Sequence, residues 1–165
     1  MSTGRAMSTI VYVASDHGAL DLKQHIVNYL KSTNTHVVDL GTHSTASVDY
    51  PDYASLLARS ILAPTSPSQM VYGIGLCGTG IGISIALNKI PGIRAALCHD
   101  HYTAKMAREH NNANVLCLGG RVVGVEVAKE CIDVFLQDGF LGGRHQQRLD
   151  KIVQLEKESV MANTM

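Results

Sequence analysis

The sequence lacks an excess of charge of either sign and lacks a long apolar run, and each absence excludes a class of function. Lysine plus arginine and aspartate plus glutamate each number 14, so the formal net charge is zero. We therefore expect no nucleic-acid partner, because phosphate backbones are bound by basic surfaces. No run of about 18 apolar residues is present, so we expect no membrane-spanning helix.

The chain also lacks the cysteine patterns of metal and redox sites. Cys77, Cys98, Cys117 and Cys131 form no CxxC pair and no Cys/His cluster with zinc spacing, and we expect neither a metal nor a cofactor. All but Cys77 are interpreted as reduced thiols of a cytoplasmic protein. Residues 1–9 lack the apolar segment of a secretory signal and are expected to be a disordered extension before a single domain, 10–160.

Short apolar runs alternate with helical patterns along this domain. Strands are expected at 10–15, 36–40, 71–76, 94–98 and 115–118, and helices at 20–30, 53–62, 82–89, 102–110, 125–137 and 145–160. Apolar strands of this length are buried on both faces, which indicates a parallel sheet. The fold class is therefore α/β, a single doubly wound (Rossmann-like) five-stranded parallel sheet with helices on both faces and a C-terminal helix. Ligands bind such sheets at the carboxyl ends of the strands.

The strongest local signal is a glycine-rich turn, Gly75–Gly82, between a buried strand and a helix. Its glycines allow backbone N–H groups to form a cradle for an anion, although a purely structural turn is the alternative. It lacks the Gly-Lys-Ser/Thr of a phosphate-binding P-loop, and Ile83 stands where a dinucleotide fingerprint needs Gly or Ala. Within the turn, Cys77 faces helix N–H groups that favour its thiolate, which could be a nucleophile or a base.

Two further polar segments stand at the ends of expected elements. Asp16-His17-Gly18 follows the first strand, where the simpler interpretation is an aspartate that caps a helix beside an unrelated histidine. Arg144 and Arg148 lie one helical turn apart at the start of the last helix. Their guanidinium groups suit a phosphate, and a solvated basic face is the alternative.

These segments belong to a larger set that occurs in one order along residues 10–155. The set is Ser15-Asp16-His17-Gly18, Asp49-Tyr50-Pro51-Asp52-Tyr53, Cys77-Gly78-Thr79-Gly80-Ile81-Gly82, His110-Asn111, Gly120-Arg121-Val122-Val123-Gly124 and Gly143-Arg144-His145-Gln146-Gln147-Arg148. In these motifs the chain resembles the type B ribose-5-phosphate isomerases, a family shared with galactose-6-phosphate isomerase subunits and allose-6-phosphate isomerase. One family branch has glycine at the position of Cys77 and a glutamate base at that of Ile83, so the resemblance is to the thiol branch.

The resemblance implies a role for each motif residue. Cys77 would be the base that moves a proton between C1 and C2 of the open-chain sugar, and His110 would open the furanose ring. The enediolate oxygens would be held by Thr79 and by the backbone of Gly78, Gly80, Ile81 and Gly82. The sugar hydroxyls would contact Asp16, Tyr50 and Asn111. The phosphate would be bound by His17, Arg121, Arg144 and Arg148.

The resemblance also implies a substrate and an assembly. Ribose 5-phosphate and ribulose 5-phosphate would interconvert through an enediolate, a step of the pentose phosphate pathway. Family members are homodimers or dimers of dimers, with His110, Asn111 and Arg121 expected from the neighbouring subunit. Galactose 6-phosphate and allose 6-phosphate stay open as substrates. The residues alone also leave open a hydrolase that uses Cys77 with His17 or His110, and a non-catalytic sugar-phosphate sensor.

Overall fold

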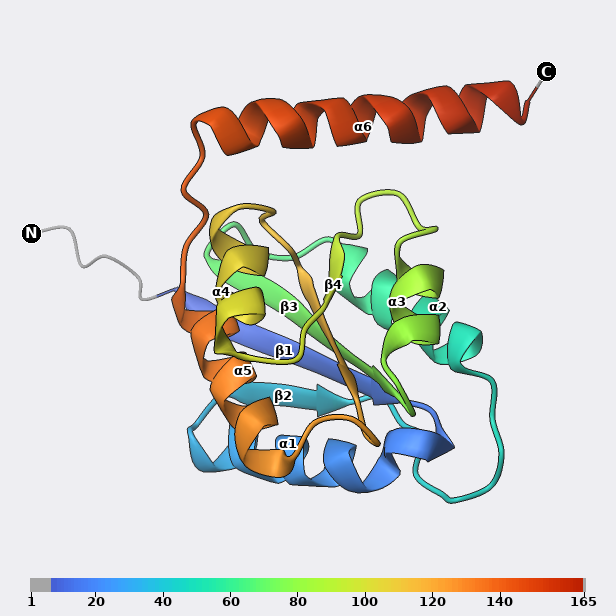
Figure 1. The fold of residues 1–165 in the computed structure, drawn as a ribbon, viewed down its shortest axis with the longest axis vertical. Helices are drawn as coiled ribbons and strands as arrows, with labels where there is room; N and C mark the ends of the chain where they lie inside the picture. Colours follow the sequence, from blue (N-terminus) through green and yellow to red (C-terminus); the bar gives the residue numbers. More distant parts are fainter. Residues whose placement is uncertain (1–6, 165) are drawn as a thin grey trace, which may run out of the picture.

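The centre of the protein is a twisted parallel sheet. A computed structural model describes residues 7–164, and within them five parallel strands run in the order β2-β1-β3-β5-β4 (Figure 1). Their bounds are β1 Ser8–Ser15, β2 His36–Asp39, β3 Gln69–Cys77, β4 Ala95–Leu97 and β5 Val115–Gly119. The predicted five-stranded parallel sheet is thus confirmed.

Helices cover both faces of this sheet. They are α1 Leu20–Ser32, α2 Tyr50–Leu62, α3 Ile81–Leu87, α4 His101–Glu109, α5 Val125–Gln137 and α6 Arg144–Ala162, with a short 3₁₀ turn at His17–Ala19. Along β1, Val13 packs into a core shared with α1, α4 and α5, whereas the next residue, Ala14, packs into a core shared with α2 and α3. Alternate residues of one strand therefore face two buried layers, as the doubly wound fold requires.

The strand order reverses between β1 and β3. The chain moves from β1 outward to β2 on one side, and from β3 toward β5 and β4 on the other. Asp16 directly follows β1 and Cys77 ends β3, and the Asp16 N–H donates to the Leu76 carbonyl at 3.1 Å. These two residues thus flank the crevice where sheets of this type bind ligands.

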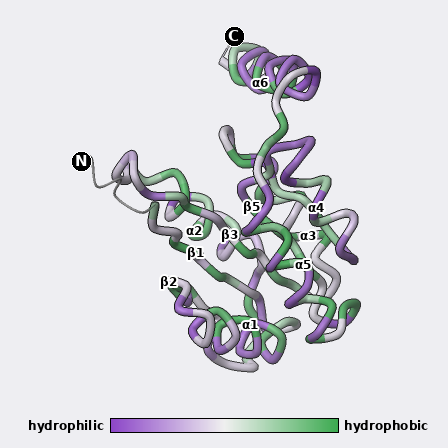
Figure 2. Tube along the Cα trace, turned by 90° about the vertical axis from the view of Figure 1, so that its left-hand side faces the viewer, coloured by the Kyte–Doolittle hydropathy of each residue, from purple (hydrophilic) through white to green (hydrophobic). Residues whose placement is uncertain are grey.

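The C-terminal helix α6 lies away from the sheet. Of its 19 residues only His145 and Leu149 are buried. Figures 1 and 2 show it leaving the body of the domain, and Figure 2 shows green apolar segments among its purple polar ones. Its exposed apolar side chains are Ile152, Val153, Leu155, Val160 and Met161. No helix in residues 7–164 is both long and apolar enough to cross a membrane.

The observed boundaries correct several predictions. Strand β1 begins at Ser8, so the end of the expected disordered extension pairs in the sheet, while residues 1–6 lie outside the described chain. Helix α2 begins at Tyr50 and not at Tyr53, because Pro51 occupies the first helical turn, where a missing N–H is tolerated. Cys77 is the last residue of β3, one residue later than the strand was expected to end.

Candidate active site

Cys77 sits at the carboxyl end of β3 with its sulfur held by the glycine-rich turn. The thiol is 4% exposed, and its Sγ accepts a hydrogen bond from the Gly80 N–H at 3.2 Å. Gly80 has a φ of 76°, a left-handed conformation that glycine adopts without steric cost. This turn directs the Gly80 amide dipole at the Cys77 sulfur.

The other three cysteines have no such environment. Burial raises the pKa of Cys98 to about 12 and that of Cys131 to about 11. Complete burial also raises the pKa of Cys117. These raised pKa values favour the protonated thiol at neutral pH, and the three cysteines are free in the described chain.

Two turns interlock beneath the thiol. The Gly120 N–H donates to the Cys77 carbonyl and the Arg121 N–H to the Gly78 carbonyl, each at 2.9 Å. A Cβ atom added to Gly119 would lie 2.6 Å from the Thr79 carbonyl oxygen. The β5–α5 turn can therefore approach the β3–α3 turn this closely only with glycine at position 119.

The aromatic ring of Tyr50 packs onto the same cradle from α2. A Cβ atom on Gly82 would meet this ring at 2.6–2.9 Å, so the missing side chain makes room for it. Tyr50 remains 38% exposed, which leaves part of its ring open to a ligand. Nearby, the Thr79 hydroxyl oxygen accepts from the Ile81 N–H at 3.2 Å. Tyr50, Thr79 and the glycine amides thus lie around Cys77.

Asp16 and His17 border the cradle from the end of β1. Asp16 Oδ1 accepts from the Gly18 N–H at 2.8 Å, so the carboxylate caps the 3₁₀ turn, as the simpler interpretation expected. His17 Nδ1 accepts from the Val48 N–H at 3.2 Å. In neutral His17 the proton must then reside on Nε2, which is thereby a donor.

Arg121 corrects an expectation. We expected it to reach the site from a neighbouring subunit, but its guanidinium group lies against Gly78 of its own chain. It also lines, with His17, a hollow of about 260 Å³ beside the cradle. The reason is topological, because β5 lies next to β3 and delivers the residues after it to the same crevice. We name Asp16, His17, Tyr50, Cys77–Gly82 and Arg121 the thiol cluster.

A second set of polar residues gathers where α4 ends and α6 begins. The imidazole rings of His110 and His145 stack with centroids 4.1 Å apart and planes at 11°. Partial burial lowers the pKa of His145, and the nearby His110, Arg144 and Arg148 lower it further. We name these four residues and Asn111 the histidine cluster. His145 was quoted within a motif but given no role, although its place one turn before buried Leu149 marks the inner face of α6.

The two clusters lie at opposite edges of the sheet in one chain. Helix α4 returns from the carboxyl edge to the start of β5, and the Gly73 N–H donates to the Asn114 carbonyl there. Gly73 is four residues before Cys77 on β3, a separation of about 13 Å along the strand at roughly 3.3 Å per residue. One chain therefore does not bring His110, Asn111, Arg144 or Arg148 to its own thiol cluster.

The titratable groups form no evident metal centre. No three His, Cys, Asp or Glu side chains gather at ligand distance within residues 7–164.

Comparison with known protein families identifies the family to which this chain belongs. A family model described as Ribose/Galactose Isomerase matches residues 11–152, which include every residue of both clusters. The chain belongs to this family. The isomerase from Escherichia coli K12 named ribose-5-phosphate isomerase B is 45% identical over 142 residues, covering 86% of this chain and 93% of that protein.

Solved structures agree with this assignment. Ribose-5-phosphate isomerase B from Clostridium thermocellum superimposes with a TM-score of 0.86 at 47% identity, covering 91% of this chain and 99% of its own. The Mycoplasma genitalium enzyme, solved with bound ribulose 5-phosphate, gives a TM-score of 0.85 at 46% identity, covering 92% and 99%. The family resemblance drawn from the motifs is thereby confirmed.

Proposed function

We propose that this protein is an aldose–ketose isomerase that interconverts ribose 5-phosphate and ribulose 5-phosphate. The observation that carries the proposal is the Cys77 sulfur beneath the Gly80 amide, inside a cradle belonging to the ribose/galactose isomerase family. Relatives named for this reaction, one of them solved with ribulose 5-phosphate, support the choice of substrate. The reaction places the protein in the pentose phosphate pathway and, we infer, in the cytoplasm.

In this proposal Cys77 carries the proton. Its thiolate removes the proton from C2 of the open-chain aldose, and the resulting thiol returns it to C1. A second proton passes from O2 to O1 of the enediolate, so that C2 becomes the carbonyl carbon of the ketose and C1 carries a hydroxyl group. Negative charge develops on the sugar oxygens in the enediolate between these steps. Preorganised N–H donors of the turn 78–82 and the Thr79 hydroxyl stabilise that charge, the usual origin of the largest catalytic contribution. Asp16 and Tyr50 contact the sugar hydroxyls.

The histidine cluster supplies the other half of the site from a second subunit. His110 opens the furanose ring by acid–base catalysis, and Asn111 contacts a hydroxyl group. Arg144 and Arg148 grip the phosphate together with His17 and Arg121 of the thiol cluster. Because the clusters lie at opposite edges of one chain, this division of labour requires two chains.

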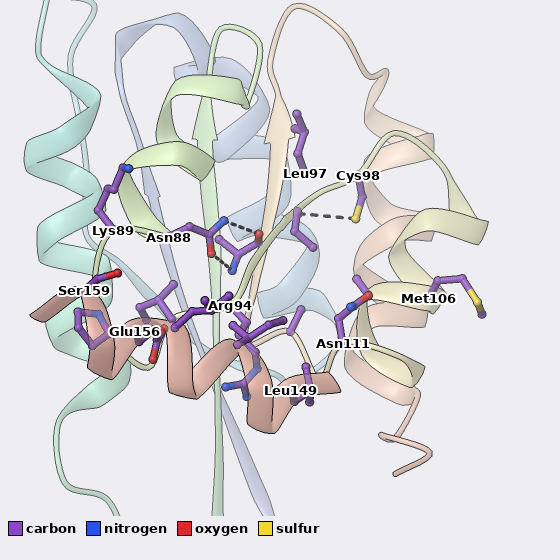
Figure 3. Close-up of a pocket in the computed structure, with 18 of the residues that line it drawn as sticks. Asn88, Lys89, Arg94, Leu97, Cys98, Met106, Asn111, Leu149, Glu156 and Ser159 are labelled. Atoms are coloured by element: carbon purple, nitrogen blue, oxygen red, sulfur yellow. Dashed lines mark hydrogen bonds between the residues drawn. The ribbon is translucent and has the colours of Figure 1, made fainter. Parts of the chain in front are cut away.

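The exposed face of α6 is where we place that second copy. A groove of about 940 Å³ separates α6 from β4 and α4, and Figure 3 shows Leu97, Met106 and Leu149 along it. The apolar residues of this groove and the exposed apolar side chains of α6 together form a contiguous apolar surface, unlike the single apolar residues that are scattered over most protein surfaces. A two-fold dimer covers such a surface twice and completes two sites at once, and a dimer of dimers remains open.

The test is a coupled assay of purified protein with ribose 5-phosphate, allose 6-phosphate and galactose 6-phosphate side by side. We expect the pentose phosphate to have the highest kcat/KM, with the same rate in EDTA, since the proposed mechanism uses no metal. Preference for a hexose phosphate would move the protein to that branch of the family. Activity lost to EDTA and restored by a divalent ion would contradict the thiol mechanism.

Release of labelled hydrogen from C2 separates this proposal from its rivals of another class. Only isomerisation exchanges that hydrogen with solvent. A Cys-dependent hydrolase or a sugar-phosphate sensor would leave the label in place.

A further inference from the structure

The turn that follows α4 contains a residue in a left-handed conformation. Asn112 has a φ of 44°, and its N–H donates to the Arg108 carbonyl at 3.1 Å, the bond that ends a helix on a left-handed residue. His110 and Asn111 are the two residues directly before it. The turn at Asn112 therefore closes the helical run, and contacts that hold this turn also hold the helix end that carries those two side chains.

Two arginines hold Asn112 from different sides. Arg94 Nε donates to its backbone carbonyl at 2.9 Å, and Arg108 Nη1 donates to its Oδ1 at 3.1 Å. Arg108 Nη1 also donates to the Ala113 carbonyl, and Nη2 donates to the Tyr72 hydroxyl of β3 at 3.1 Å. The turn is thus tied to the sheet through Arg108 and to the start of β4 through Arg94.

Stability alone does not account for these contacts, because burying an arginine side chain carries a desolvation cost. Arg108 is only 6% exposed and lies over the rings of Tyr72 and Phe135, at 4.8 and 5.6 Å from their centroids. Neither Arg94 nor Arg108 forms an ion pair with a carboxylate in the described part of the chain. A buried cation without a counter-ion carries a desolvation cost that a neutral, well-packed residue avoids.

We propose that Arg94 and Arg108 are positioning residues for the shared site. They keep Asn112 left-handed and thereby aim His110 and Asn111 at the sugar bound by the neighbouring subunit. This inference rests on the proposed function, because it assigns a purpose to the direction of His110. Figure 3 shows Arg94 and Asn111 both lying along the groove beside α6, where the second copy is placed.

The decisive experiment is a double-mutant cycle between Arg94→Met and His110→Ala. Methionine keeps the apolar stem of half-buried Arg94 and removes the Nε donor. Arg94→Met alone should lower kcat for ribose 5-phosphate about tenfold, since misalignment of a catalytic group slows the chemistry. In the His110→Ala background the same change should lower kcat less than about twofold, because the residue it positions is already gone.

Three measurements make this cycle selective. Arg59→Met, at an exposed site near the end of α2, is the matched control and should keep wild-type kcat. Thermal unfolding and sedimentation should show Arg94→Met folded and in the wild-type oligomeric state. Multiplicative losses in the double mutant would overturn the positioning role. Wild-type protein that fails to isomerise ribose 5-phosphate would instead contradict the proposed function.

A second pair of variants tests the left-handed turn itself. Asn112→Gly and Asn112→Ala both remove the acceptor of Arg108, but only alanine is penalised at positive φ. At a temperature where both are folded, Asn112→Ala should lose several-fold more kcat than Asn112→Gly. Equal kcat values would show that the backbone conformation of residue 112 does not govern the site.

Discussion

The rings of His110 and His145 stack face to face with centroids 4.1 Å apart, although His110 caps the end of one helix and His145 lies in another. His110 ends α4, and His145 lies in the first turn of α6. Partial burial and the nearby His110, Arg144 and Arg148 lower the pKa of His145, which favours its neutral imidazole. His145 thus provides a flat, uncharged surface that orients the proposed ring-opening group.

Substitution of His145 tests this surface. A stacked pair contributes about 0.5–1.5 kcal/mol beyond burial, which corresponds to roughly twofold to tenfold in a rate. His145→Ala should lower kcat for ribose 5-phosphate by that factor, whereas His145→Phe keeps a flat ring and should stay close to wild type. Steady-state assays compare the two, and equal losses would mean that His145 acts through its nitrogens.

The same histidine predicts a pH dependence of stability. Because its folded pKa lies below the ordinary 6.5, the unfolded chain takes up this proton first as the pH falls. The contribution of neutral His145 to the free energy of unfolding is therefore fully present above pH 6.5. It is lost as the pH drops through the folded pKa. As the pH is lowered from 7.5 to 5, the Tm of the wild type should fall more than the Tm of His145→Phe. A difference that is constant over this range would contradict the lowered pKa.

In the proposed mechanism Cys77 carries the chemical step. Cys77→Ala should lower kcat by about 10²–10⁴-fold, the usual contribution of a general base, with little change in substrate affinity. Cys77→Ser should be nearly as impaired, since its hydroxyl is hardly ionised at neutral pH. Cys117→Ser at the buried, high-pKa thiol is the matched control for loss of sulfur. Near-normal turnover of Cys77→Ala would refute the base assignment.

We propose that Arg148 binds the phosphate, so its removal should weaken only the binding of that group. A charge-assisted hydrogen bond contributes about 1.5–3 kcal/mol, so Arg148→Ala should lower kcat/KM for ribose 5-phosphate roughly tenfold to a hundredfold. Lysine should rescue only partly, because it keeps the charge without the planar fork. The weak turnover of unphosphorylated ribose should be almost unaffected. An equal proportional loss of kcat/KM for both sugars would mean that Arg148 stabilises the fold or contacts the sugar, and does not bind the phosphate.

The fold could be predicted because its signals are local. Short apolar strands such as Val115–Leu118 alternate with helical periodicity, and that alternation is enough for a doubly wound sheet. The placement of Cys77 and Asp16 at adjacent strand ends followed from the same topology. Boundaries near Tyr50 and Ser8 were less accurate, because a proline inside the first turn and a strand edge leave weak traces in sequence.

The proposed division of the site between two chains could not be predicted from the residues alone. His110 precedes β5 and Arg121 follows it. The two residues are only eleven positions apart, yet the strand between them places them at opposite edges of the sheet. Motif spacing records order along the chain and not the edge at which a residue emerges. For the same reason the stacking of His145 on His110 could not be predicted, since the two residues are 35 positions apart in the sequence.

Complementation between two impaired variants tests the proposed shared site most directly. Cys77→Ala and His110→Ala subunits are unfolded, mixed in equal amounts and refolded, and isomerisation of ribose 5-phosphate is measured. If one chain supplies Cys77 and the other His110, half of the dimers hold one intact site, and activity should return to about a quarter of wild type. No recovery in a preparation proven to contain heterodimers would place both residues in one chain's site and contradict this account.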